Sequence, residues 1–475
     1  MSLFVLEAVK KKYPDSQIDF IVHPESAVLV KGHPSIHQVY IVPSDQVKSS
    51  SPDREVSELL EVMEDFIEGM MTTHYQLSLN LNQEYFCALI HGLISSDKKI
   101  GFTFSGNNHF QVEHRMMEHL FAIPVDRSRN PFHVVDVFKQ TFWGEGIPPS
   151  CAKLPPLPDV DKGMYPHDLQ FIVFQIGSAW MGKRWPLKYW AVLLQSLSQH
   201  FPIVFVGSTE ELKLWNDLIT CLPSNFFREK KNVYNAMGKT TLLESATLIK
   251  KAKLLITGDT VAMHLGAVCQ TKTIALFGAS NPVETGPYGE GHFVFQTSIE
   301  VKEQLPLGVT SEGLEKIKPH YISDFVLKGF CPSDVSIWET GWNKETCRWE
   351  LKGKEGELHP FQKENINICE KEGDCFFSEA NKGLRINKIL QEVISHIENC
   401  MINLTSENLF QLQEADRQWA EITSKSLLWE AYRIALNGLP MDNLQLYLRK
   451  RKERLWQAVE EEKASYQAAI SLEKD

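Results

Sequence analysis

The hydrophobic positions of the first 150 residues fall into short extended runs that alternate with longer amphipathic segments. Segments 56–71 and 84–94 carry apolar residues at helical spacing, and each lies between two extended runs. The extended runs that predict strands are 18–22, 39–42, 77–81 and 99–102. This alternation predicts a domain of the α/β class.

A Pro-rich passage between Pro148 and Pro166 interrupts the pattern. Proline lacks a backbone N–H and has a fixed φ, so this passage fits neither a central strand nor a helix interior. We predict that residues 148–167 form an interdomain linker. The alternation then resumes, with strands near 171–176, 202–206, 254–257 and 272–277. Parallel strands joined by helices predict a doubly wound sheet.

After about residue 300 the sequence becomes charged and then helical in pattern, without the alternation typical of strands. The chain is therefore predicted to have four parts. They are a Rossmann-like domain over 1–147, the linker 148–167, a second Rossmann-like domain over 168–300, and a charged insert with a helical extension over 301–475.

Residues 254–289 combine a strand, a helix start, a second strand and a Gly/Pro-rich loop. The apolar run 254–257 suits a buried parallel strand. Asp259 and Thr260 then offer side-chain caps for a helix whose apolar side includes Met263. A helix that begins there directs free N–H groups and its positive dipole end beyond the strand. The pattern predicts a site for an anionic ligand.

The composition is that of an ordinary globular protein and narrows the classes of partner. Of 475 residues, 43% are hydrophobic and 23% charged, which suffices for two or three domains with full cores. The net charge of −11 argues against a nucleic-acid partner. Nine scattered cysteines lack the dense, even spacing of a disulfide scaffold. Without a secretory signal pattern or a long apolar run, we expect a cytoplasmic protein.

Four blocks of sequence occur in order between residues 171 and 295. They are FIVFQIGS at 171–178 with KRWP at 183–186 and Trp190; PIVFVG at 202–207 with Glu210 and Glu211; NAMGKTTLLESATLIKKAK at 235–253; and Asp259, Thr260, His264 with TIALFGASNPVETGP at 273–287. Together these blocks resemble glycosyltransferase family 9, the heptosyltransferases of lipopolysaccharide assembly.

The resemblance implies the GT-B fold, in which two Rossmann-like domains face a cleft, here followed by the helical C-terminal extension. Residues 1–147 would serve the acceptor side and 168–300 would bind the nucleotide sugar. The implied reaction moves a sugar, typically heptose from ADP-heptose, onto lipopolysaccharide or another cell-envelope saccharide with inversion. The implied partners are an ADP-sugar donor and a saccharide or lipid-linked acceptor, without a cofactor.

The beginning of the chain departs from the family pattern. Residues 2–22 align with the family's first helix, its turn at Tyr13 and Pro14, and its second strand. The first strand and a Gly-Asp loop would therefore precede Met1, and that loop supplies the Asp proposed as general base. A sugar hydroxyl needs such a base because its pKa lies far above neutrality. No residue of this chain matches it, so the catalytic residue is unassigned.

Two interpretations of this departure stay open. In the first, the natural protein extends upstream of Met1 and is an active transferase. In the second, the chain is a catalytically defective nucleotide-sugar-binding or scaffold protein of the same fold.

The resemblance also implies a set of donor-binding residues. Lys183 would place its charge on the donor diphosphate, and Glu211, with Glu210 as a competitor, would hold the ribose hydroxyls. Each residue also has a simpler interpretation. Lys183 would be a surface lysine and Glu211 a charged residue at a helix start. Asp259 and Thr260 would cap a helix, and His264 would be structural. The implied set is Gly177, Ser178, Lys183, Glu211, Asp259, Thr260, Met263 and His264.

Other positions carry weaker signals. The family commonly has Gly where this chain has Val261, and a β-branched side chain there crowds the approach of a diphosphate. Trp185 and Trp190 fit either stacking on a ligand or core packing, and we favour the core. Polar residues facing an acceptor would come from Asn107 and Asn108, His114 and Arg115, and the turn at 130–133.

We predict no metal site. The pair Asp159 and Asp161 lies in the linker, and the spacings of Cys331 with Cys347 and of Cys369 with Cys375 miss those of common zinc sites. The basic run 449–452 lies in an amphipathic segment that fits either peripheral contact with the inner membrane or a solvated helix. We favour the solvated helix.

The intact mass of the protein from its native cells tests the first interpretation of the chain start. We expect a mass above 54.3 kDa and an upstream peptide containing the Gly-Asp loop. A mass equal to that of the printed chain would favour the second interpretation.

Overall fold

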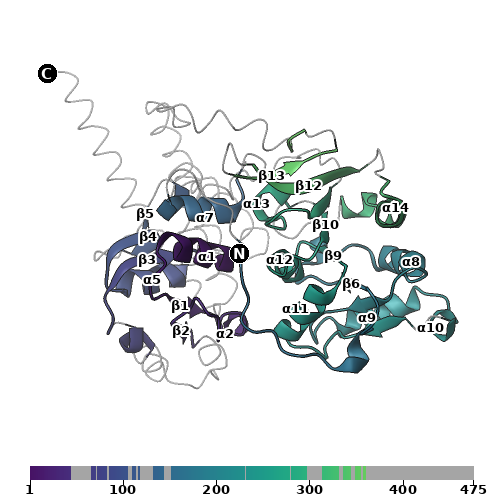
Figure 1. The fold of residues 1–475 in the computed structure, drawn as a ribbon, viewed down its shortest axis with the longest axis horizontal. Helices are drawn as coiled ribbons and strands as arrows, with labels where there is room; N and C mark the ends of the chain where they lie inside the picture. Colours follow the sequence, from purple (N-terminus) through teal and green to yellow (C-terminus); the bar gives the residue numbers. More distant parts are fainter. Residues whose placement is uncertain are drawn as a thin grey trace, which may run out of the picture. The chain divides into compact units, whose positions relative to one another are not determined.

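A computed structural model of the chain describes residues 1–43, 66–70, 72–82, 85–104, 110–113, 116–117, 132–143, 151–229, 232–278, 280–296, 313–330, 335–343, 348–354 and 357–359. The chain divides into two compact units. Unit 1 comprises Met1–His74 and Asp126–Ile366, and unit 2 comprises Tyr75–Val125 and Asn367–Asp475 (Figure 1). The predicted helical extension and the basic run 449–452 lie outside the described residues.

Unit 2 contains a three-stranded sheet in the order β3-β4-β5, with helix α5 following β3. Strand β4 is parallel to β3 and antiparallel to β5. His91 of α5 is buried, and its ring bonds the Ser78 hydroxyl at 2.9 Å and the Phe102 carbonyl at 2.9 Å. These bonds fasten the helix to both β3 and β4. The elements are β3 (Tyr75–Asn80), α5 (Tyr85–Leu93), β4 (Ser96–Phe104) and β5 (Phe110–Glu113).

The N-terminal segment of unit 1 forms a small parallel pair of strands, β1 and β2, in the described residues. The predicted strands at 18–22 and 39–42 are thereby confirmed. The elements are α1 (Ser2–Lys12), β1 (Asp19–Val22), α2 (Pro24–Ala27), β2 (Gln38–Ile41) and α7 (Val134–Trp143).

The rest of unit 1 is built on an eight-stranded sheet in the order β13-β12-β11-β10-β9-β6-β7-β8. Strands β6 to β11 are parallel, whereas β12 and β13 continue the sheet antiparallel at one edge. The strands are β6 (Ile172–Gln175), β7 (Ile203–Phe205), β8 (Val233–Asn235), β9 (Leu254–Gly258), β10 (Thr273–Phe277), β11 (Phe293–Gln296), β12 (Ser336–Asn343) and β13 (Arg348–Lys352). The α/β fold class predicted from the sequence is confirmed.

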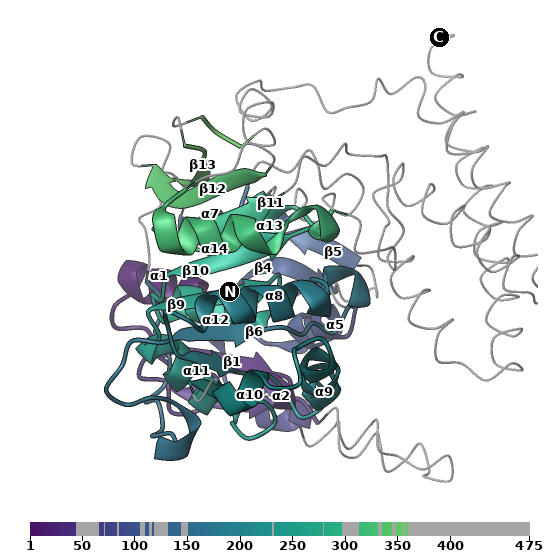
Figure 2. The ribbon, with the colours of Figure 1, turned by 90° about the vertical axis from the view of Figure 1, so that its right-hand side faces the viewer.

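Helices cover both faces of this sheet. The connecting helices are α8 (Leu187–Leu197), α9 (Leu212–Thr220), α10 (Phe226–Glu229), α11 (Leu242–Lys251), α12 (Val261–Val268), α13 (Pro282–Thr285) and α14 (Pro319–Lys328). Single 3₁₀ turns occur at Lys162–Met164, Met181–Lys183 and Leu314–Lys316. In Figure 1, α11 and α12 lie on one side of β6 and β9, with α8 and α14 on the other. Figure 2 shows α8 and α14 in front of the strands.

The side chains of each strand alternate between two separate cores. Ile172 and Phe174 of β6 point into the core beneath α8, α9 and α14. Val173 points into the opposite core, which includes Leu248 of α11. Because successive strand residues face opposite sides, a strand buried on both faces is a continuous apolar run. This explains why β6, β7, β9 and β10 were predicted correctly.

The predicted linker packs on the sheet domain where it is described. From residue 151 to 171 it forms no helix or strand longer than the turn Lys162–Met164. Val160 and Tyr165 enter the core beside α11, and the Thr247 hydroxyl donates to the Pro158 carbonyl at 2.8 Å. The bounds of the four predicted parts of the chain stay predictions.

Two features of the sheet domain differ from the sequence-based expectations. Strands β12 and β13 lie in a stretch predicted to contain no strand, so that expectation was wrong. Thr260 and Asp259 were expected to cap helix α12, yet no side chain caps it. Their side chains are engaged elsewhere, in bonds to Gln175 and Lys183. By contrast, Thr241 and Glu244 form a complete capping box at α11.

Helix α7 is fastened to the segment after α13 by a buried polar network. The buried Lys139 ammonium donates to the Tyr288 hydroxyl at 2.7 Å, and this hydroxyl donates to Asp136 Oδ1 at 2.5 Å. Asp136 Oδ2 accepts the Trp349 backbone N–H at 2.9 Å. Burial lowers the pKa of Lys139 to about 8, opposed by Asp136. The network therefore balances a buried lysine against a buried carboxylate through one hydroxyl.

The substitution Tyr288→Phe should lower the free energy of unfolding by about 2 kcal/mol, because two buried charged groups lose a shared partner. Chemical denaturation measures this change. The matched control is Tyr165→Phe, which removes a hydroxyl bonded at 2.7 Å to the Lys251 ammonium; within the described ranges no carboxylate bonds that hydroxyl. We expect about 1 kcal/mol there. Equal losses in the two variants would contradict the assigned network.

Candidate functional site

The order of the parallel strands predicts where a ligand binds. From β6 the chain proceeds outward to β7 and β8, whereas from β9 it proceeds to the other side through β10 and β11. Neighbouring strands β6 and β9 thus lie where the strand order reverses. In open α/β sheets the connections leave a crevice at the carboxyl ends of such strands. Most residues of the sequence-predicted site follow β6, β7 or β9 at this edge.

Lys183 and Asp259 meet at this edge although they are 76 positions apart in the chain. The Lys183 ammonium lies 2.5 Å from Asp259 Oδ2. The carboxylate is 8% exposed and the lysine side chain 40% exposed, so the cation retains access to solvent. A Cβ atom at Gly258 would lie 3.2 Å from the Lys183 carbonyl oxygen, so the lysine turn packs tightly on the end of β9.

The turn that carries Lys183 is held by its own residues. Arg184 Nε donates to the carbonyl of buried Ser178 at 2.7 Å, and the Ser178 hydroxyl accepts the Trp180 N–H at 3.3 Å. Trp180 and Met181 at the tip are 53% and 78% exposed. The turn therefore has a fixed base and presents apolar side chains to solvent beside the ion pair.

Glu211 occupies the neighbouring strand end. Its Oε2 accepts the Ser208 N–H at 3.0 Å, and its Oε1 accepts from Gln175 Nε2 at 3.2 Å. A side chain at Gly177 would collide with this carboxylate, which explains the glycine after β6. The structure thus brings Glu211 to the edge, whereas its competitor Glu210 is exposed to solvent.

Gln175 is a site residue that sequence reasoning missed. It is 7% exposed at the last position of β6 and lies directly opposite Thr257 in the pairing with β9. Its Oε1 accepts from the Thr257 hydroxyl at 2.9 Å and from the Thr260 hydroxyl at 3.1 Å. A buried amide at the end of an apolar strand was the available signal, because such a group requires partners.

Helix α12 begins at this edge with its first amides uncapped by side chains. Val261 at its first position is 57% exposed. Met263 is fully buried, and its N–H donates to the Thr260 carbonyl at 3.1 Å, so the structure does not bring its side chain to the surface. The two N–H groups before that of Met263, those of Val261 and Ala262, have no intrahelical acceptor. They remain suited to an anion.

His264 follows in the first turn of α12 and is uncharged. Burial lowers its pKa to about 3, and the positive charges of the chain's first amino group and Lys183 act in the same direction. A neutral imidazole offers one N–H donor and one acceptor. His264 therefore brings hydrogen-bonding capacity but no charge to this edge.

Other predicted residues are placed as follows. Trp185 and Trp190 are buried in the core beneath α8, which confirms the preferred interpretation. His133, from the turn expected to face an acceptor, is fully buried and bonds the Gly286 carbonyl at 3.0 Å. Asn107, Asn108, His114 and Arg115 lie outside the described residues, as do Cys331, Cys347, Cys369 and Cys375.

Comparison with known proteins adds to this geometry. The sequence model of glycosyltransferase family 9 (heptosyltransferase) matches residues 64–306, which is just over half of the chain. The chain belongs to glycosyltransferase family 9. A relative is lipopolysaccharide heptosyltransferase 3 of Escherichia coli strain K12, which is 22% identical over 301 residues. That alignment covers 61% of this chain and 82% of the relative.

Two solved structures share the fold of this glycosyltransferase. One is a family 9 glycosyl transferase from Veillonella parvula, at 20% identity and a TM-score of 0.52, covering 67% of this chain and 90% of that one. The other is the E. coli heptosyltransferase WaaC with ADP, at 17% identity and a TM-score of 0.51, covering 69% and 96%. The GT-B fold expected from the sequence is thereby confirmed.

No group of three or more His, Cys, Asp or Glu side chains within the described ranges is arranged to hold a metal ion. Across the same ranges, every helix falls short of the length and apolar character that crossing a membrane requires.

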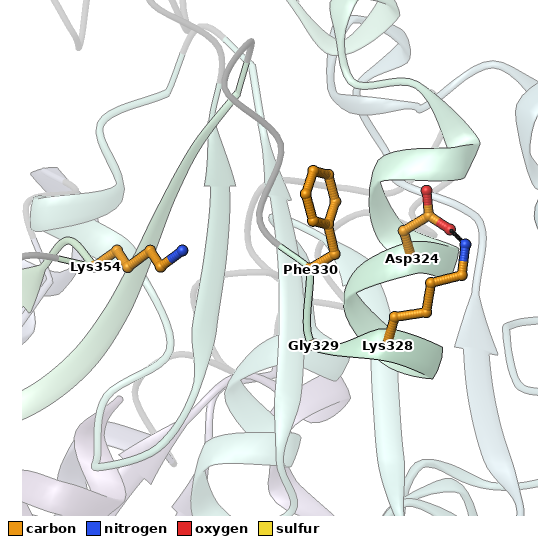
Figure 3. A pocket seen from close by; sticks show the side chains of 5 residues that line it. All are labelled: Asp324, Lys328, Gly329, Phe330 and Lys354. Carbon is orange, nitrogen blue, oxygen red and sulfur yellow. Dashed lines mark hydrogen bonds and ion pairs between the residues drawn. The ribbon is translucent and has the colours of Figure 1, made fainter.

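A hollow lies elsewhere on unit 1, at the end of α14. Its lining residues are Asp324, Lys328, Gly329, Phe330 and Lys354 (Figure 3). Lys328 is paired with Asp324 at 2.8 Å along the helix. None of these residues follows a parallel strand at the carboxyl edge, so we assign the candidate site to the β6–β9 edge on topology and contacts.

The His264 ring should not titrate between pH 7.5 and 4.5. NMR of the histidine side chains measures this, with His264→Gln to assign the signal. Since the folded pKa of about 3 lies below the ordinary 6.5, the unfolded chain takes up this proton first. This group's contribution to stability is therefore lost as the pH falls from 6.5 toward 3. A midpoint near 6.5 in the folded protein would contradict the placement.

Proposed function

We propose that this family 9 protein transfers a heptose from ADP-heptose to a saccharide of lipopolysaccharide or a related cell-envelope glycan, by single displacement with inversion. The observation that carries the proposal is the pairing of Lys183 and Asp259 beside the uncapped start of α12, where the strand order reverses. A cation and free amides at one strand edge suit a diphosphate. The choice of heptose rests on the names of the relatives, and the choice of ADP rests on the solved complex of WaaC with ADP.

In this proposal the donor lies across the ends of three adjacent strands. Glu211, after β7, accepts hydrogen bonds from the ribose hydroxyls, because each carboxylate oxygen retains a free lone pair. Lys183 and the first amides of α12 bind the diphosphate. His264 donates one hydrogen bond without adding charge. As the bond to the leaving diphosphate breaks, Lys183 offsets the negative charge that develops there.

Asp259 has a supporting role in this arrangement. A carboxylate next to a diphosphate would repel it, but here its charge is paired with Lys183 at 2.5 Å. The carboxylate is nearly buried while the ammonium retains access to solvent. Asp259 therefore orients the lysine, and the lysine contacts the ligand. Gly177 and Ser178 shape the turn, and Thr260 holds the start of the helix.

The acceptor side and the cellular location are also proposals. A lipid-linked or soluble saccharide would supply the attacking hydroxyl, and the proton of this hydroxyl would pass to a general base, a role that we assign to none of the described residues. The reaction would take place in the cytoplasm, where nucleotide sugars are available. The basic run 449–452, which fits a peripheral membrane contact, lies outside the described residues.

The substitution Lys183→Ala should weaken binding of ADP at least tenfold, because a charge-assisted contact to phosphate is lost. Titration calorimetry with ADP measures the affinity. The matched control is Lys188→Ala, which removes the same positive charge from a more exposed position in the neighbouring helix α8. An unchanged affinity of the Lys183 variant for every nucleoside diphosphate tested would overturn the site.

Turnover separates a transferase from a binding protein. Incubation of the wild-type protein with ADP-heptose and lipopolysaccharide core acceptors should release ADP and add one heptose to the acceptor. Binding of ADP without any transfer would reject the transferase and leave a nucleotide-sugar-binding protein.

A further inference from the structure

Gln175 sits between the two ends of the proposed donor site. It ends β6, the central strand of the trio β7-β6-β9. Adjacent strands lie about 4.8 Å apart, so the ends of β7 and β9 are roughly 10 Å from each other. Any ligand that reaches from Glu211 after β7 to the helix start after β9 must pass the end of β6.

The Gln175 amide bonds to both sides at once. Toward β7, its Nε2 donates to Glu211 Oε1 at 3.2 Å. Toward β9, its Oε1 accepts from Thr257 at 2.9 Å and from Thr260 at 3.1 Å, and the two hydroxyls lie 3.0 Å apart. Thr260 is the residue from which α12 departs. One side chain therefore joins the carboxylate at one end to the helix start at the other.

The chemistry of these partners suits an uncharged group that both donates and accepts, as an amide does at neutral pH. The NH₂ group is the donor that a carboxylate accepts, and the carbonyl oxygen accepts from both hydroxyls. A carboxylate here would face Glu211 as a like charge, and an apolar side chain would leave the buried Thr257 hydroxyl and the half-buried Thr260 hydroxyl without this partner. The register fixes the arrangement, because Gln175 is directly opposite Thr257.

We infer that Gln175 is a positioning residue that sets the distance and orientation between the ribose-binding carboxylate and the diphosphate-binding helix start. The inference rests on the proposed function, since it names the device that lets one nucleoside diphosphate engage both ends together. Gln175 acts through Glu211 and Thr260 and does not itself need to touch the ligand.

The first experiment compares ADP with inorganic pyrophosphate as calorimetric probes. ADP engages both ends, whereas pyrophosphate engages the helix start and Lys183. The substitution Gln175→Leu should weaken ADP about tenfold and pyrophosphate less than threefold. In the double variant with Glu211→Gln, the ADP losses should be less than additive, because the two residues act through one contact.

A matched control tests for a merely structural effect. Asn232 also carries a side-chain amide in the sheet domain, and it lies just before β8, at the amino ends of the parallel strands. Its Nδ2 donates to the Ser198 carbonyl at 2.7 Å. Asn232→Leu should lower the thermal midpoint without changing the affinity for ADP. Equal tenfold losses for ADP and pyrophosphate in Gln175→Leu would overturn the positioning role.

The second experiment measures ADP affinity at different pH values in a single variant, Gln175→Glu. It keeps the inference testable if Gln175→Leu does not fold. In Gln175→Glu the introduced carboxyl group repels Glu211 when ionised. When protonated it donates to Glu211 as the amide does, and two adjacent carboxyl groups share a proton readily. The ADP affinity relative to wild type should be at least tenfold lower at pH 8 and within threefold at pH 5. A pH-independent ratio would contradict the inference.

The two proposals fail in distinguishable ways. Loss of ADP affinity in Lys183→Ala, with wild-type binding in Gln175→Leu and Gln175→Glu, rejects the positioning role and retains the donor site. Wild-type ADP binding in all three variants rejects the donor site and the positioning role with it.

Discussion

The reversal of strand order at β6 and β9 is the constraint on which the rest of the site depends. The chain leaves β6 toward β7 and leaves β9 toward β10, and in open α/β sheets such a reversal places the ligand crevice at the carboxyl ends of the two strands. The two strands nevertheless pair in register, with Gln175 opposite Thr257. Residues from distant parts of the sequence therefore meet there within hydrogen-bond distance, on strands that are buried and rigid.

Positive charge is scarce among the side chains assigned to this edge. Lys183 is balanced by Asp259, Glu211 is held by an amide and a backbone N–H, and His264 is neutral. In the proposed donor site, most of the attraction for an anion would then come from backbone amides and from one lysine that retains access to solvent. Such groups are fixed before a ligand arrives, so little reorganisation is needed on binding.

Sequence reasoning correctly predicted the strands and motifs that a local pattern of residues determines. The strands buried on both faces are continuous apolar runs, and the family motifs located Lys183, Glu211 and Asp259 near one edge. It missed β12 because a strand such as Ser336–Asn343 mixes polar and apolar residues and gains its place by pairing with β11. It missed Gln175 because the partners of a buried amide depend on strand register, which no single stretch of sequence encodes. Thr260 was expected to cap its helix, but a tertiary bond to Gln175 replaced the local one.

The network of Asp136, Lys139 and Tyr288 bears on how this chain can be divided. The Pro-rich passage at 148–167 looks like a natural place to cut, yet Asp136 and Lys139 lie before it and Tyr288 after it. A fragment that starts beyond the passage would expose the tyrosine hydroxyl and the Trp349 backbone N–H that Asp136 satisfies. A fragment of this chain that contains the sheet domain should therefore include α7, so that Lys139 and Asp136 stay together with Tyr288.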